Sequence, residues 1–96
     1  MQRKNEQSIG EILRQFLKMS QLENVVFEKQ IAALWQETLG DQITQQTDRI
    51  HLEQGVLYVT LASPALKNDI MMQRTAIRSE LNKKMGSDII KNVVIR

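Results

Sequence analysis

The chain has 96 residues, which is the size of one small domain, so we expect residues 1–96 to fold around a single core. Hydrophobic residues make up 42% of the chain and charged residues 25%, a composition typical of globular proteins that excludes wholesale disorder. The absence of cysteine excludes a disulfide scaffold, a thiolate zinc site and a cysteine nucleophile. The polar start and the lack of any run of about 18 apolar residues predict a cytoplasmic protein without a membrane partner.

The charges are unevenly distributed along the chain. Thirteen Lys and Arg residues and eleven Asp and Glu residues give a formal net charge of +2. Residues 1–20 hold four basic and two acidic groups, residues 21–54 hold two and six, and residues 55–96 hold seven and three. Such segregation favours a surface that attracts anions, although it also occurs in proteins that have no charged partner.

Two helices are expected in the first 40 residues. Ser8 and Glu11 match a capping box, and apolar residues then recur at helical spacing from Ile9 to Leu17. The segment 20–23 repeats the capping pattern, and a second periodic face runs until Gly40, whose residue type is typical of a helix C′ position. The polar segment 41–48 predicts a short helical turn or a loop.

A β-hairpin is expected next. Ile50 and Leu52 alternate with polar residues, Gln54 and Gly55 supply a turn, and residues 56–61 are rich in β-branched and aromatic side chains. Leu57, Val59 and Leu61 should share one covered face of the sheet with the apolar pair of the first strand.

The last elements are a long helix and a strand. Ser63 and Pro64 indicate a helix start, because proline lacks an amide and its fixed φ suits the first turn. The helix should run to about Met85 and close at Gly86, and residues 89–95 predict a strand that returns to the hairpin. The resulting order, α-α-β-β-α-β, predicts an α+β fold with helices packed on a small three-stranded sheet.

No residues have the spacing of a catalytic or metal site. The single histidine, His51, should lie at the surface, since a general base needs a positioned partner and a metal needs several ligands. The glycines are too far apart for a dinucleotide-binding or P-loop pattern, and no serine stands in a nucleophile elbow. We therefore expect a protein that is not an enzyme and uses no cofactor or metal.

A basic row follows the expected third helix. Lys67, Arg74 and Arg78 line up along one edge of its apolar face over 11 residues, or roughly 16 Å, and Lys83 and Lys84 extend the positive charge at the helix end. Such a row can track several phosphates. The alternative is that these side chains extend beside the core and stay solvated. The expected core residues of this helix are Leu66, Ile70, Ile77 and Leu81.

Two aromatic residues have both a structural and a binding interpretation. Trp35 should pack in the core, with base stacking as the lesser alternative. Tyr58 points to the sheet face opposite Leu57, and with His51 it would form a stacking surface if that face were open. Two rings without flanking arginines are weak evidence for such a surface.

Met71 and Met72 are expected in the core or at its rim.

Four segments carry a family resemblance: SIGEIL at 8–13, LWQETLG at 34–40, GVLYV at 55–59 and SPALKNDI at 63–70. In this order and spacing they resemble the DciA-like family of bacterial proteins, in the short form found in Bacteroidetes. The resemblance covers nearly the whole chain. It implies a K-homology-like fold and the role of a loader of the replicative helicase, with contact to nucleic acid, to a DnaB-type helicase, or to both.

The sequence departs from this family pattern in two ways. Longer members carry a tail associated with helicase binding, whereas this sequence ends at Arg96 directly after the last expected strand. A K-homology groove also uses a Gly-x-x-Gly loop, and no two glycines here have that spacing. We therefore expect binding mainly through backbone electrostatics. The expected contacts are Lys67, Arg74 and Arg78, with Arg3, Lys4, Lys83 and Lys84 as outer contacts.

The leading interpretation is a non-enzymatic accessory protein of DNA replication or repair that binds single-stranded or structured nucleic acid, DNA rather than RNA. The alternative is a protein-interaction module that docks the replicative helicase or another replication protein through the first helix and the acidic middle segment, without nucleic-acid contact. A homodimer through the open sheet face or the edge of the last strand is compatible with either.

Overall fold

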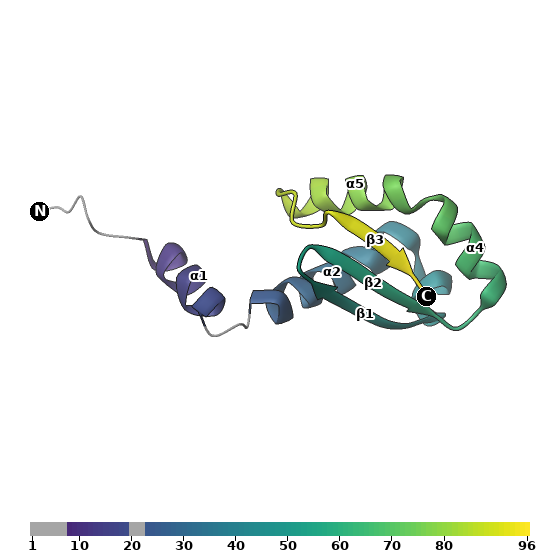
Figure 1. Ribbon diagram of the computed structural model, residues 1–96, viewed down its shortest axis with the longest axis horizontal. Helices are drawn as coiled ribbons and strands as arrows, with labels where there is room; N and C mark the ends of the chain where they lie inside the picture. Colours follow the sequence, from purple (N-terminus) through teal and green to yellow (C-terminus); the bar gives the residue numbers. More distant parts are fainter. Residues whose placement is uncertain (1–7, 20–22) are drawn as a thin grey trace, which may run out of the picture.

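The computed structural model describes residues 8–19 and 23–96, which form helices on one face of a small sheet (Figure 1). The order of elements and the α+β class agree with the prediction. The expected strand at 89–95 is shorter, and the expected third helix is divided in two at Gln73. The elements are α1 (Ile9–Met19), α2 (Glu23–Leu39), α3 (Asp41–Gln45), β1 (Thr47–Glu53), β2 (Val56–Leu61), α4 (Pro64–Met72), α5 (Arg74–Met85) and β3 (Asn92–Ile95).

The sheet has the order β1-β2-β3, with β1 antiparallel and β3 parallel to the central strand β2. The antiparallel pair is a hairpin with a two-residue turn, in which Gln54 has φ 51° and Gly55 has φ 82°. Positive φ at both positions is the requirement of a type I′ turn, so the predicted turn is confirmed. A parallel partner needs a long crossover, which α4 and α5 supply.

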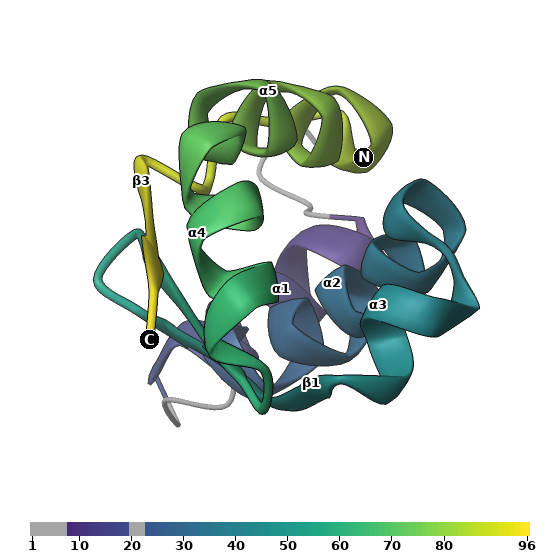
Figure 2. The same ribbon diagram turned by 90° about the vertical axis from the view of Figure 1, so that its right-hand side faces the viewer.

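The core lies between the sheet and helices α2, α4 and α5, which cover the same face of the sheet (Figures 1 and 2). Trp35 is completely buried there, as predicted, and its Nε1 donates to Thr47 Oγ1 at 3.0 Å. The Thr47 hydroxyl in turn donates to the Ile43 carbonyl at 2.8 Å, so the indole N–H is satisfied inside the core. The other fully buried side chains include Ile31, Leu57, Val59, Leu81 and Ile90.

The helix ends follow the predicted signals. Glu11 N donates to Ser8 Oγ at 3.0 Å and Ser8 N donates to Glu11 Oε1 at 3.2 Å, which completes the capping box. Ser63 caps α4 by accepting from Leu66 N, and Gly86 ends α5 with φ 79°. The second predicted capping box begins at Ser20, outside the described residues.

The division between α4 and α5 was not expected from the sequence. Gln73 N donates to the carbonyl of Ile70, three residues back, and the chain changes direction (Figure 2). Helix α4 then packs against β2 and β3, whereas α5 packs against α2 and β3. Met71 packs against the core, but Met72, just before the break, is 86% exposed, so its predicted place in the core or at its rim is wrong.

Helix α1 lies next to α2 and beyond the end of the sheet (Figure 1). Its apolar stripe is exposed, with Ile9 at 84%, Ile12 at 53% and Leu13 at 54%. The predicted amphipathic helix is therefore present, but its apolar side is not part of the core. No helix in the described part of the chain is long and apolar enough to cross a membrane.

Candidate nucleic-acid interface

The three cations of the predicted basic row lie on two helices. Lys67 lies half-buried on α4, Arg74 is the exposed first residue of α5, and Arg78 is half-buried one turn further along. The structure thus places Arg74 and Arg78 four residues apart on one helix, where neighbouring side chains share a face. Because the chain bends at Gln73, Lys67 does not continue their row along the same axis.

Lys83 and Lys84, in the last turn of α5, have different surroundings. Lys84 Nζ lies 3.3 Å from Glu37 Oε2 and donates to Thr38 Oγ1 at 3.0 Å, both on α2. Lys83 is exposed and lines a shallow pocket together with Arg78. The remaining predicted contacts, Arg3 and Lys4, lie outside the described residues.

The charge on α4 and α5 is mostly uncompensated. Residues 64–85 carry five basic and two acidic side chains. Across residues 8–19 and 23–96, only Lys84 of these five forms an ion pair; Lys67, Arg74, Arg78 and Lys83 form none. We call these five residues the α4–α5 cations. Solvated cations without carboxylate partners can neutralise phosphates and release counterions, which is the physical basis of nonspecific nucleic-acid binding.

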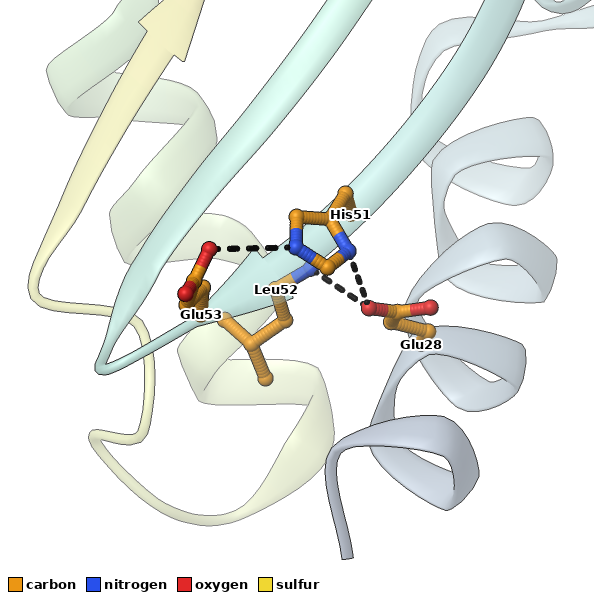
Figure 3. Close-up of polar contacts among 4 residues, drawn as sticks. All are labelled: Glu28, His51, Leu52 and Glu53. Carbon is orange, nitrogen blue, oxygen red and sulfur yellow. Dashed lines mark hydrogen bonds and ion pairs between the residues drawn. The ribbon is translucent and has the colours of Figure 1, made fainter. Parts of the chain in front are cut away.

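The sheet face opposite the helices, here called the outer face, carries a second group of polar side chains (Figure 3). His51 Nδ1 lies 2.9 Å from Glu28 Oε2, and His51 Nε2 lies 3.3 Å from Glu53 Oε1. Glu28 extends from α2 and also accepts the backbone N–H of Leu52 at 2.8 Å. The His51 side chain is 37% exposed, so it lies at the surface as predicted, but it has partners on two elements that the sequence did not reveal. No group of three or more His, Cys, Asp or Glu among the described residues could hold a metal ion.

Tyr58 lies at the centre of the outer face. Its ring is stacked with His51, with centroids 6.2 Å apart and an interplanar angle of 26°. The guanidinium carbon of Arg96 lies 4.3 Å from the Tyr58 ring centroid, in cation–π geometry. An arginine therefore flanks the two rings, contrary to the expectation from the sequence. The alternation of side chains in the last strand was a usable signal, since Arg96 follows Val94 by two residues.

Comparison with protein families matches residues 8–95 to the family described as "Dna[CI] antecedent, DciA". A search of the curated proteins and of the solved structures finds no match, so similarity to the K-homology fold stays a prediction. The matched segment spans every described helix and strand, from the capping box of α1 to the end of β3. By this match, the chain belongs to the DciA family.

Proposed function

We propose that this protein is a non-enzymatic accessory protein of DNA replication or repair that binds single-stranded or structured nucleic acid, DNA in preference to RNA, mainly through backbone electrostatics. Membership of the DciA family implies an accessory role of the helicase-loader type in replication. DciA is a family of helicase-loader accessory proteins and not a known enzyme family. Family membership does not specify direct contact with nucleic acid, which is the part that we propose.

The observation that carries this proposal is that the α4–α5 cations other than Lys84 form no ion pair with the described residues. Exposed Arg74 and Lys83 form no ion pair within the described part of the chain. Lys84 is expected to contribute less than Lys83, because its ammonium is already held by Glu37 and Thr38. A surface of this kind binds the backbone of a polyanion with little sequence preference.

The test is fluorescence anisotropy of a labelled DNA oligonucleotide at about 50 and 200 mM salt. On a single strand each neutralised phosphate contributes about −0.7 to the log–log salt slope, so changing Lys67, Arg74 and Arg78 together to Ala should flatten the slope by about two. The same measurement with RNA and with duplex DNA of equal length shows which nucleic acid the protein binds most tightly.

The matched control also removes three positive charges, through Arg14→Ala, Lys29→Ala and Lys91→Ala. These residues are exposed and belong to α1, to α2 and to the segment before β3. The control variant should keep most of the affinity and slope of the wild type. Equal losses in the two triple variants would show that the contact follows net charge and not the α4–α5 cations.

A second candidate function, docking of the replicative DnaB-type helicase or another replication protein, is supported by the exposed apolar stripe of α1. Ile9 and Ile12 are 84% and 53% exposed, which is unusual for isoleucines at helical spacing. A docked partner should remain bound in a pull-down after nuclease treatment, and Ile9→Ser with Ile12→Ser should release it. Loss of every partner upon nuclease digestion would leave only the nucleic-acid function.

A further inference from the structure

The strand register defines which residues share the outer face. His51 pairs with Tyr58, and Tyr58 pairs with Val94, so these three form one row across the sheet. Arg49 pairs with Thr60 in the adjacent row. Because the opposite faces of the same strands hold the buried Leu57 and Val59, these rows point away from the core.

Arg96 lies in the same row as Arg49 and Thr60. Its N–H donates to the Val59 carbonyl at 2.8 Å, and its carbonyl accepts from Leu61 N at 3.0 Å. These bonds continue the parallel pairing by one residue beyond β3 and place Arg96 beside Thr60. The backbone of Arg96 is therefore held by β2, and its exposed side chain extends over the Tyr58 ring.

No described helix lies over this face, since α2, α4 and α5 cover the opposite face and α1 lies beyond the end of the sheet (Figures 1 and 2). Its centre consists of half-buried side chains with flat or apolar surfaces, namely Tyr58, Val94 and His51. Arg49 and Arg96 at one end form no ion pair with the residues that the structure describes. At the other end the Glu53 carboxylate is already engaged by His51. The guanidinium groups without ion pairs therefore lie together at one end of the face, at Arg49 and Arg96.

We infer that the outer face is a stacking platform for an unpaired base of single-stranded nucleic acid. The base stacks on the Arg96 guanidinium, which lies over the Tyr58 ring, and the adjoining phosphate lies near Arg49. A guanidinium plane stacks on bases much as an aromatic ring does, and its charge also attracts the phosphate. Duplex DNA does not fit this platform, because its bases are already stacked on one another.

This inference rests on the proposed function. It adds that the ligand is single-stranded with accessible bases, a preference that the α4–α5 cations alone do not produce. A protein partner is disfavoured because the centre of the face is small and is bordered by charged groups, whereas stable protein interfaces have cores depleted of charge. The predicted homodimer through this face is the competing occupant.

The test compares two labelled single strands with the same number of phosphates: an oligothymidylate and an abasic strand. The wild type should bind the oligothymidylate about tenfold more tightly, which is the usual scale for one stacked base. Arg96→Lys keeps the charge but removes the planar group, and should bring the two affinities to within about twofold. Tyr58→Leu, which removes the ring beneath, should have the same effect.

Two controls separate stacking from charge and folding. Tyr58→Phe keeps the ring and should keep the tenfold preference. Arg74→Ala with Arg78→Ala should weaken both strands equally and leave their ratio unchanged. Urea unfolding of each variant shows that the fold is retained, and loss of the preference in a folded Arg96→Lys protein supports the platform.

The outcomes distinguish the two proposals. Equal, salt-sensitive binding of both strands by the wild type would overturn the platform and leave the α4–α5 function standing. A full preference in both Arg96→Lys and Tyr58→Leu would likewise overturn it. Binding of neither strand would overturn both proposals. Dimerisation in light scattering that is abolished by Tyr58→Leu, without base preference, would assign the face to a second copy of this chain.

Discussion

At the scale of single residues, two polar side chains connect different elements of the fold. Asn82 is 4% exposed, and its Nδ2 donates to the Ile90 carbonyl at 2.8 Å while its Oδ1 accepts from Ile90 N at 3.0 Å. These paired bonds attach the segment before β3 to α5. Glu28 plays a related part at the outer edge of β1, where it accepts from Leu52 N. An occupied N–H at that position also hinders pairing with another strand.

Removing the Asn82 amide should destabilise the protein strongly. Asn82→Ala leaves the buried N–H and C=O of Ile90 without partners, and each unsatisfied group costs about 1–3 kcal/mol. We expect the free energy of unfolding in urea to fall by about 2 kcal/mol or more. Asn68→Ala, on the exposed side of α4, is the matched control and should be close to neutral. A loss below about 0.5 kcal/mol for Asn82→Ala would mean that water replaces the amide.

At the scale of elements, the hairpin and the α4–α5 bend show how local and tertiary forces differ. The β1–β2 turn depends on Gly55, because glycine adopts a positive φ without steric cost. The bend at Gln73 has no proline or glycine to mark it. It arises because α4 packs against β2 and β3 while α5 also packs against α2, and one straight helix does not satisfy both sets of contacts.

The hairpin turn should tolerate substitution poorly at Gly55. A Cβ there would lie 2.9 Å from Lys91 Cγ, and the φ of 82° already disfavours an L side chain. Gly55→Ala should therefore lower the free energy of unfolding by about 1–2 kcal/mol from the backbone alone, with a further loss from the clash.

Two variants separate the strain from the clash. Gly86→Ala has a similar φ of 79° with no atom within 4 Å of the new Cβ, so it should show the backbone cost alone. In a Lys91→Ala background, Gly55→Ala should become milder. If the cost of Gly55→Ala is the same in both backgrounds, Lys91 does not contribute to it.

At the scale of the whole molecule, stability should come from the sheet and the helices on its inner face, and not from α1. Ile31 is completely buried, whereas Ile9 and Ile12 are largely exposed. Ile31→Ala should cost about 2–5 kcal/mol in urea unfolding. The double variant Ile9→Ser and Ile12→Ser should change the free energy of unfolding by about 0.5 kcal/mol or less. A large loss in the double variant would place α1 in the cooperative core.

Several features of the fold could be predicted because they depend on neighbours in the chain. The capping box at Ser8, the Ser63 and Pro64 helix start and the turn at Gln54 and Gly55 are local, and they agree with the structure. The buried face of the third helical region followed from periodicity, since Ile70, Ile77 and Leu81 are all buried. The α4–α5 cations were named from the same pattern, and their role stays a prediction.

The amino-acid sequence by itself determined the order of the elements, the hairpin, the core-facing residues and the family, because each depends on local backbone preference or on hydrophobic period. Only the tertiary structure decided that the basic row bends at Gln73, that α1 presents its apolar stripe to solvent, and that Arg96 covers Tyr58. These features arise from contacts between segments distant in the chain, such as Glu28 with His51 and Arg96 with Tyr58. Strand register and helix packing set such contacts, and local sequence patterns do not encode them.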